Sequence, residues 1–172
     1  LCAKKEACQL LLSGCGEPLS DSAAGLCATA TEKIIAAPDL APELYKELET
    51  LGQERGIRIL DGGLRQHLAG VDVGFSIADY AIAETGTMVQ RSEHEELRLA
   101  TMICEVHVAV VPVSRLRATA LDMADELSAL LAETPSYTAF ISGASRTADI
   151  ERVLALGVHG PLSMHILLWE DK

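Results

Sequence analysis

The segment 106–111 (VHVAVV) constrains the fold of this chain more than any other segment. Valine or alanine occupies every position of it except His107. β-Branched and small apolar side chains on both sides of a strand are typical of the interior of a parallel sheet, which is covered on both faces. The segment therefore predicts a buried interior strand, and we expect His107 to be a core histidine.

Strand and helix patterns alternate along the rest of the chain. Residues 32–37 and 57–60 have the length and apolar character of buried strands, and residues 40–55 between them repeat leucine at helical spacing. A strand–helix–strand unit is typical of a parallel sheet, so the sequence predicts an α/β fold. The other predicted elements are strands over 80–83, 87–90, 138–141 and 163–169 and helices over 114–133 and 147–156.

Length and composition indicate one globular domain. The chain has 172 residues, of which 49% are hydrophobic and 23% charged. We predict a helical lead-in over residues 1–31 and a domain over residues 32–172. Because the chain begins without methionine and residues 1–5 do not open a signal peptide, we expect sequence upstream of Leu1 to be missing.

The charge balance excludes several classes of partner. Asp and Glu number 25 against 14 Lys and Arg, for a net charge of −11. A nucleic-acid binder needs a basic face, and 3% aromatic residues leave little for base stacking. No run approaches the ~18 apolar residues of a membrane span. We expect no nucleic-acid partner and no membrane span.

The cysteines indicate a reducing compartment. Five are present, and no pair has C-x-x-C spacing, which a structural zinc site or an iron–sulfur cluster would favour. Free thiols are typical of the cytoplasm. We therefore expect a cytoplasmic chain with no metal or cofactor of its own, while the role of four cysteines stays open: Cys2, Cys8, Cys15 and Cys27.

The first candidate site is the segment 142–147 (SGASRT), which follows a predicted strand and opens a predicted helix. Ligands gather at the carboxyl ends of strands in α/β sheets, and free N–H groups at a helix start favour an anion. Arg146 would clamp a carboxylate or phosphate. In the structural alternative, Thr147 is merely the cap of the helix. The predicted ligand-binding residues here are Ser142, Gly143, Ser145, Arg146 and Thr147.

The second candidate site is the segment 83–87 (AETGT), between two predicted strands. Glu84 would serve as a general base or a nucleophile if burial disfavoured its charged form. Thr85, Gly86 and Thr87 would contact the ligand. In the structural alternative, Glu84 is a turn residue that caps nearby N–H groups or pairs with an arginine.

The third candidate is His159, which precedes a rigid Gly-Pro pair. It would donate a proton or hydrogen-bond a ligand, although a lone histidine is more often structural. His94 lies in a charged segment, residues 92–96, that we expect to be exposed. The sequence contains no metal-ligand spacing and no nucleophile-elbow motif.

Three segments together carry a resemblance to a known family: 77–89 (IADYAIAETGTMV), 140–151 (FISGASRTADIE) and 157–168 (GVHGPLSMHILL). In order and spacing they resemble the LUD-domain proteins of lactate utilization, specifically the LutC-type subunit. The resemblance runs from about Glu32 to the C-terminus. Departures include Ile77 and Ala144, where family members often have glycine and proline, respectively.

The resemblance implies a three-layer sandwich with a mostly parallel sheet, like that of the sugar-phosphate isomerase and CoA-transferase superfamily. It also implies a cytoplasmic role in the oxidation of L-lactate to pyruvate. Iron–sulfur clusters would belong to partner subunits, so this chain would be an accessory subunit of an L-lactate dehydrogenase complex.

Three hypotheses about mechanism remain open. In the first, a cleft lined by Arg146, Glu84 and His159 holds a small carboxylate or phosphate, or docks an iron–sulfur partner. In the second, the chain is a stand-alone enzyme that acts on a sugar phosphate or a CoA thioester through Glu84. In the third, the motif residues only build turns of a non-catalytic scaffold.

Overall fold

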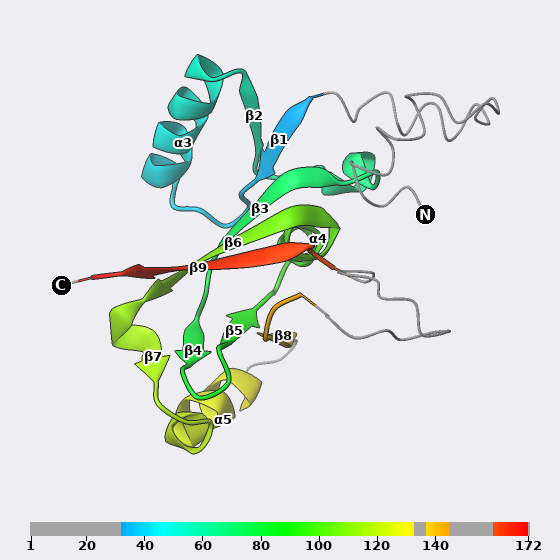
Figure 1. Cartoon of the computed structure of the whole chain (residues 1–172). Helices are drawn as coiled ribbons and strands as arrows, with labels where there is room; N and C mark the ends of the chain where they lie inside the picture. Colours follow the sequence, from blue (N-terminus) through cyan, green and yellow to red (C-terminus); the bar gives the residue numbers. More distant parts are fainter. Residues whose placement is uncertain (1–31, 133–136, 145–159, 172) are drawn as a thin grey trace.

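The computed structural model describes residues 32–132, 137–144 and 160–171 (Figure 1). Within them, a five-stranded sheet has the order β2-β1-β3-β6-β9, and all neighbouring strands run parallel. This confirms the predicted α/β class with a mostly parallel sheet, and it confirms the segment 106–111 as part of an interior strand. The strands are β1 (Lys33–Ala36), β2 (Ile57–Leu60), β3 (Val71–Ile77), β6 (Cys104–Pro112) and β9 (Ser163–Trp169).

Helices lie on both faces of this sheet. Helix α3 (Pro42–Glu54) packs beside β2, and helix α4 (Glu95–Ile103) packs on β3 and β6. Successive strand residues point to opposite faces. Phe75 lines a groove with leucines of α3, whereas the neighbouring Gly74 meets α4. The two helices therefore cover opposite faces, which makes a helix–sheet–helix arrangement.

Gly74 sets the distance between α4 and the sheet. A Cβ atom at this position would lie 2.1 Å from the carbonyl oxygen of Ala100 and 2.8 Å from the Sγ atom of Cys104. Only glycine allows this approach of strand and helix. The core beside it is formed by buried residues of β1, the 3-10 helix η2 (Leu64–His67), β3, α4 and β6: Ile34, Ala36, Leu64, Val71, Ala100 and Cys104.

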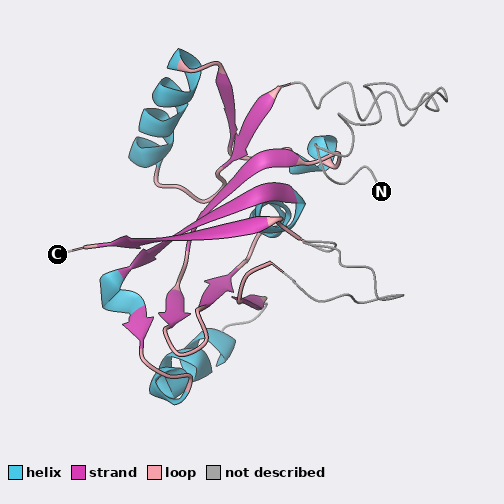
Figure 2. Cartoon of the chain, viewed as in Figure 1, coloured by secondary structure: helices cyan, strands magenta, loops and turns pink. Residues whose placement is uncertain are grey.

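A second sheet, mainly antiparallel, lies below the first (Figure 2). Its order is β7-β4-β5-β8, and α5 (Ala124–Ala132) packs against it through Leu127 and Leu130, which lie against the buried cluster of Ile82, Val89 and Met123. The elements here are β4 (Tyr80–Ile82), β5 (Thr87–Arg91), β7 (Leu116–Arg117), β8 (Thr138–Ile141) and the 3-10 helices η3 (Val113–Arg115) and η4 (Leu121–Met123).

The helix predicted over residues 114–133 is wrong in its first half, where η3, β7 and η4 form instead. The reason is tertiary pairing of the backbone. The carbonyl of Arg117 accepts a hydrogen bond from Ala83 N at 2.8 Å, and the carbonyl of Ala118 accepts one from Glu84 N at 3.0 Å. The two carbonyls therefore accept hydrogen bonds from the backbone that follows β4 in the second sheet, and not from a helix of their own. This pairing overrides the helical spacing of the side chains.

Strand β3, helix α4 and the 3-10 helix η2 had no sequence prediction. The sequence predicts that the charged segment 92–96 is exposed; Glu93 and His94 are exposed, whereas Ser92 is buried and α4 begins at Glu95. Its carboxylates have partners: Glu96 accepts a hydrogen bond from Leu64 N at 2.9 Å. The strands predicted over 57–60, 138–141 and 163–169 have the predicted bounds, whereas the lead-in 1–31 and the helix predicted over 147–156 lie outside the described residues.

None of the helices in the described part of the chain combines the length and the apolar character that crossing a membrane requires.

Candidate functional site

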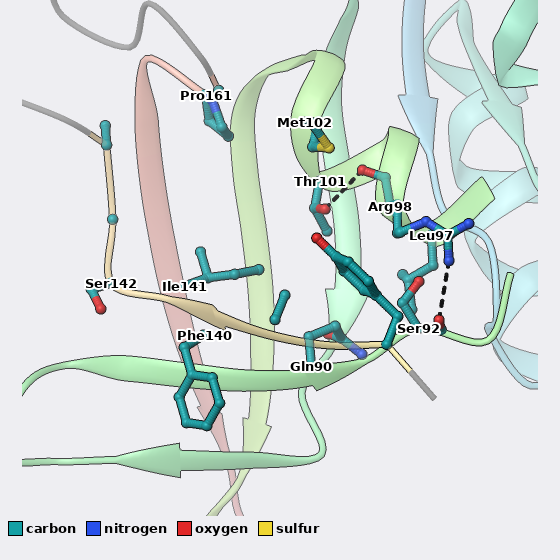
Figure 3. A pocket seen from close by; sticks show the side chains of 15 residues that line it. Gln90, Ser92, Leu97, Arg98, Thr101, Met102, Phe140, Ile141, Ser142 and Pro161 are labelled. Carbon is teal, nitrogen blue, oxygen red and sulfur yellow. Dashed lines mark hydrogen bonds between the residues drawn. The ribbon is translucent and has the colours of Figure 1, made fainter. Parts of the chain in front are cut away.

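A cavity of about 290 Å³ lies between α4, β8 and the residues that precede β9 (Figure 3). Its volume suits a small organic molecule. Helix α4 contributes Leu97, Arg98, Thr101 and Met102 to the wall. The opposite wall comes from Tyr137, from β8 and from the loop that follows β8 up to Ala144.

Parts of two predicted motifs meet at this cavity. Ser142 and Gly143, from the SGASRT motif, line it together with Gly160 and Pro161, which follow His159. The two segments are brought together by the strands next to them. Strand β8, which precedes Ser142, pairs with β5 in the second sheet, while β9, which follows Pro161, pairs with β6 in the first sheet. Four predicted site residues lie outside the described part of the chain: Ser145, Arg146, Thr147 and His159.

The AETGT turn reaches the same region through a chain of hydroxyl groups. The Oγ1 atoms of Thr85 and Thr87 lie 2.7 Å apart, and Thr87 Oγ1 lies 2.7 Å from Ser142 Oγ. Thr87 is buried at the start of β5, and Gly86 closes the turn with a φ of +60°, which favours glycine. The structure therefore joins two motifs that the sequence analysis treated separately.

Glu84 does not line the cavity. Its side chain is exposed, and its backbone N–H bonds to the carbonyl of Ala118. The general-base hypothesis required burial of this carboxylate, which the described surroundings do not provide. A catalytic role of Glu84 stays a prediction.

Arg98, which no sequence motif singled out, is the charged residue among the described residues that line the cavity. Its Nη1 atom donates a hydrogen bond to the Ser92 carbonyl at 3.2 Å, and its Cζ atom lies 5.2 Å from the centre of the Tyr137 ring. The hydrogen bond and the cation–π contact hold the guanidinium at the cavity wall. The available signal was the helical spacing of residues 95–103, which would have placed Arg98 on a helix.

Asp79 joins the two sheets beside the cavity but does not line it. Its carboxylate accepts hydrogen bonds from Arg91 N at 2.6 Å and from Gln90 Nε2 at 3.5 Å. Burial raises the pKa of the Asp79 carboxyl, and the hydrogen bond from Arg91 N opposes that rise without cancelling it. Asp79 therefore holds β5 against the end of β3.

The histidine predictions outside the motifs are confirmed. His107 is buried in β6 with Nε2 2.9 Å from Ser76 Oγ, and burial lowers its pKa from 6.5 to about 4. His94 is exposed. Among the described residues, no group of three or more His, Cys, Asp or Glu side chains is placed to hold a metal ion, and Cys104 is buried.

Known proteins resemble this chain in sequence. A protein named Lactate utilization protein C from Shouchella clausii is 37% identical over 103 residues, which are 59% of this chain and 45% of that protein. A protein of the same name from Halalkalibacterium halodurans is 36% identical over 104 residues, which are likewise 59% of this chain and 45% of that protein. The chain thus spans less than half the length of these curated relatives.

The comparison of structures finds a solved protein of the DUF162 family from Deinococcus radiodurans, with 18% identity, a TM-score of 0.49 and coverage of 88% of this chain and 99% of that one. The sequence model of the LUD domain matches residues 1–169. The chain belongs to the LUD domain family.

Proposed function

We propose that this chain serves lactate utilization as a subunit of a cytoplasmic system that oxidises L-lactate to pyruvate. Its relatives named Lactate utilization protein C support this role. The reaction releases two electrons and two protons, so it needs an electron acceptor. We assign the acceptors to iron–sulfur partner subunits, as the resemblance to the LUD-domain proteins of lactate utilization implies.

Within this role, the cavity beside α4 would bind a small carboxylate. The observation that carries the assignment is the position of Arg98 on a cavity wall where two motif segments converge. A guanidinium has five N–H donors, and the bond to the Ser92 carbonyl occupies Nη1. The remaining donors suit the two oxygens of a carboxylate. Arg146 is the predicted second cation.

A thermal-shift titration tests this assignment with L-lactate, pyruvate, phosphate, ribose 5-phosphate and coenzyme A. A ligand that binds only the folded state adds about 2.7 kcal/mol of stability at a hundredfold excess over its Kd. We expect lactate or pyruvate to raise the Tm, and Arg98→Met to lose that rise. Arg65→Met is the matched control, because Arg65 is exposed and pairs with Glu95 at 2.8 Å outside the cavity.

The other hypotheses give different results in the same experiment. A shift with coenzyme A or ribose 5-phosphate alone would favour a stand-alone enzyme, and Glu84→Gln should then abolish activity without changing the Tm. No shift with any compound would favour the scaffold. Oxidation of lactate by the purified chain alone would contradict the accessory-subunit role.

A further inference from the structure

We propose that the free edge of β9 pairs with the same edge of a second copy of this chain, so that two parallel sheets join across a two-fold axis. β9 is the terminal strand of the first sheet and pairs with β6 along one side over all seven of its residues. Its other side faces no described strand (Figure 1). An unpaired strand edge is a template for another strand.

The two edges of the sheet differ in how they are protected. Strand β2, at the opposite edge, has four residues and carries Arg58, which pairs with Glu32 at 3.1 Å. Strand β9 has seven residues and no Asp, Glu, Lys or Arg among them. Short length and charged side chains are the usual protection of an edge strand, and β9 has neither.

The side chains of β9 are also unusually exposed. Ile166, Leu167, Leu168 and Trp169 are 41%, 50%, 61% and 48% exposed. Because consecutive strand residues point to opposite faces, apolar surface is exposed on both faces of the sheet at this edge. Trp169 continues this surface into a groove of about 320 Å³ beneath α3, lined mostly by apolar side chains. A stable interface of standard size takes about 800 Å² from each subunit, and the apolar lining of this groove would add to what β9 contributes.

The sequence of β9 suits pairing with itself. An antiparallel pair centred on Ile166 places this residue opposite Ile166 of the second copy, Met164 opposite Leu168 and Ser163 opposite Trp169. The Ile166 pair and the Met164–Leu168 pairs are apolar, and such cross-strand pairs stabilise antiparallel sheets, while His165 falls opposite Leu167 and Ser163 leaves a polar side chain at each end of the ladder. A two-fold axis requires one surface that complements itself, and this register provides it.

The charges next to β9 do not oppose this register. In this register Glu170 falls opposite Leu162 of the second copy, and Asp171 falls opposite Pro161. No carboxylate therefore faces another carboxylate, although each copy has a net charge of −11. Pro161 lacks an N–H donor and would end the ladder.

Sedimentation equilibrium of the whole chain tests the proposal. We expect a reversible dimer, twice the 18.3 kDa of one copy. Ile166→Lys places two ammonium groups together at the axis and should give a monomer with an unchanged circular dichroism spectrum. Leu121→Lys is the matched control, because Leu121 is 86% exposed on η4 and should leave the dimer intact.

Charge pairing then tests the register. Ile166→Lys and Ile166→Glu should each be monomeric, and their mixture should form heterodimers that dissociate in high salt. If the variants unfold, hydrogen exchange of the wild-type β9 amides should slow as protein concentration rises. A wild type that is monomeric at every concentration, or a dimer that survives Ile166→Lys, overturns the proposal and leaves the edge to a different protein.

Discussion

Thr87 Oγ1 lies 2.7 Å from Ser142 Oγ, although 55 positions separate the two residues in the sequence. The contact links the start of β5 to the loop after β8. Since Ser142 lines the cavity and Thr87 is buried, the hydrogen bond holds the loop against a rigid part of the second sheet. The position of the cavity wall thus depends on a residue of a different motif.

Thr87→Val removes this link while keeping the shape of the side chain. We expect a loss of about 1 kcal/mol in the free energy of unfolding, because Ser142 loses its partner. Ligand binding in the cavity should weaken as well. Thr85→Val is the control, since Thr85 is exposed and its side chain bonds to Thr87 alone among the described residues, and it should cost less. Urea denaturation of both variants measures the difference, and equal losses would contradict this account.

Gly74→Ala should destabilise the chain strongly. The new Cβ atom would lie 2.1 Å from the Ala100 carbonyl oxygen, so α4 must move away from β3. Overpacking of a core costs roughly 1–3 kcal/mol or more. Because Arg98 lies on α4, the shift should also weaken ligand binding. Gly160→Ala is the control, because a Cβ atom added there meets no atom within 4 Å. The urea denaturation midpoint of this variant should match that of the wild type.

His107 should make stability depend on pH. Its pKa is lowered from 6.5 to about 4 by burial, so the unfolded chain binds a proton more readily than the folded chain. The contribution of His107 to the free energy of unfolding is therefore fully present above pH 6.5. It falls by on the order of 3 kcal/mol as pH drops toward 4. His107→Gln keeps a polar group near Ser76 and should flatten this slope. The same change at exposed His94 should leave the slope intact, which denaturation curves at several pH values would check.

Asp79 should also make stability depend on pH, in the direction opposite to the effect of His107 and in a lower range of pH. Its pKa is raised by burial, so the folded chain holds this proton more tightly than the unfolded chain. The contribution of Asp79 to stability therefore falls as pH rises above its ordinary value of 3.8. Asp79→Asn keeps an acceptor for Arg91 N but removes the charge. We expect its stability relative to the wild type to increase with pH, and a constant difference across pH would disprove the effect.

Local sequence patterns predicted the elements whose side chains are mainly apolar. The strands over 57–60 and 163–169 are such cases, and their bounds are confirmed. Strand β3 was missed although Val71, Val73, Phe75 and Ile77 alternate with Asp72, Gly74 and Ser76, a period of two that is typical of a strand. Each of the last three residues is explained by a distant partner: Asp72 accepts from Ile34 N at 2.6 Å, Gly74 meets α4, and Ser76 bonds to His107. Long-range contacts of this kind leave no trace in a local window.

The sequence by itself determined the α/β class, the family resemblance and the motifs, because these depend on residue types and on their spacing along the chain. The tertiary structure alone decided which motif residues share a cavity. Arg98, Ser142 and Gly160 meet because α4 packs on β3, β8 pairs with β5, and β9 pairs with β6. It also placed Glu84 on an exposed turn, since the backbone of that turn pairs with residues 117 and 118. Spacing along a chain does not contain these distances; only the packing of whole elements against one another sets them.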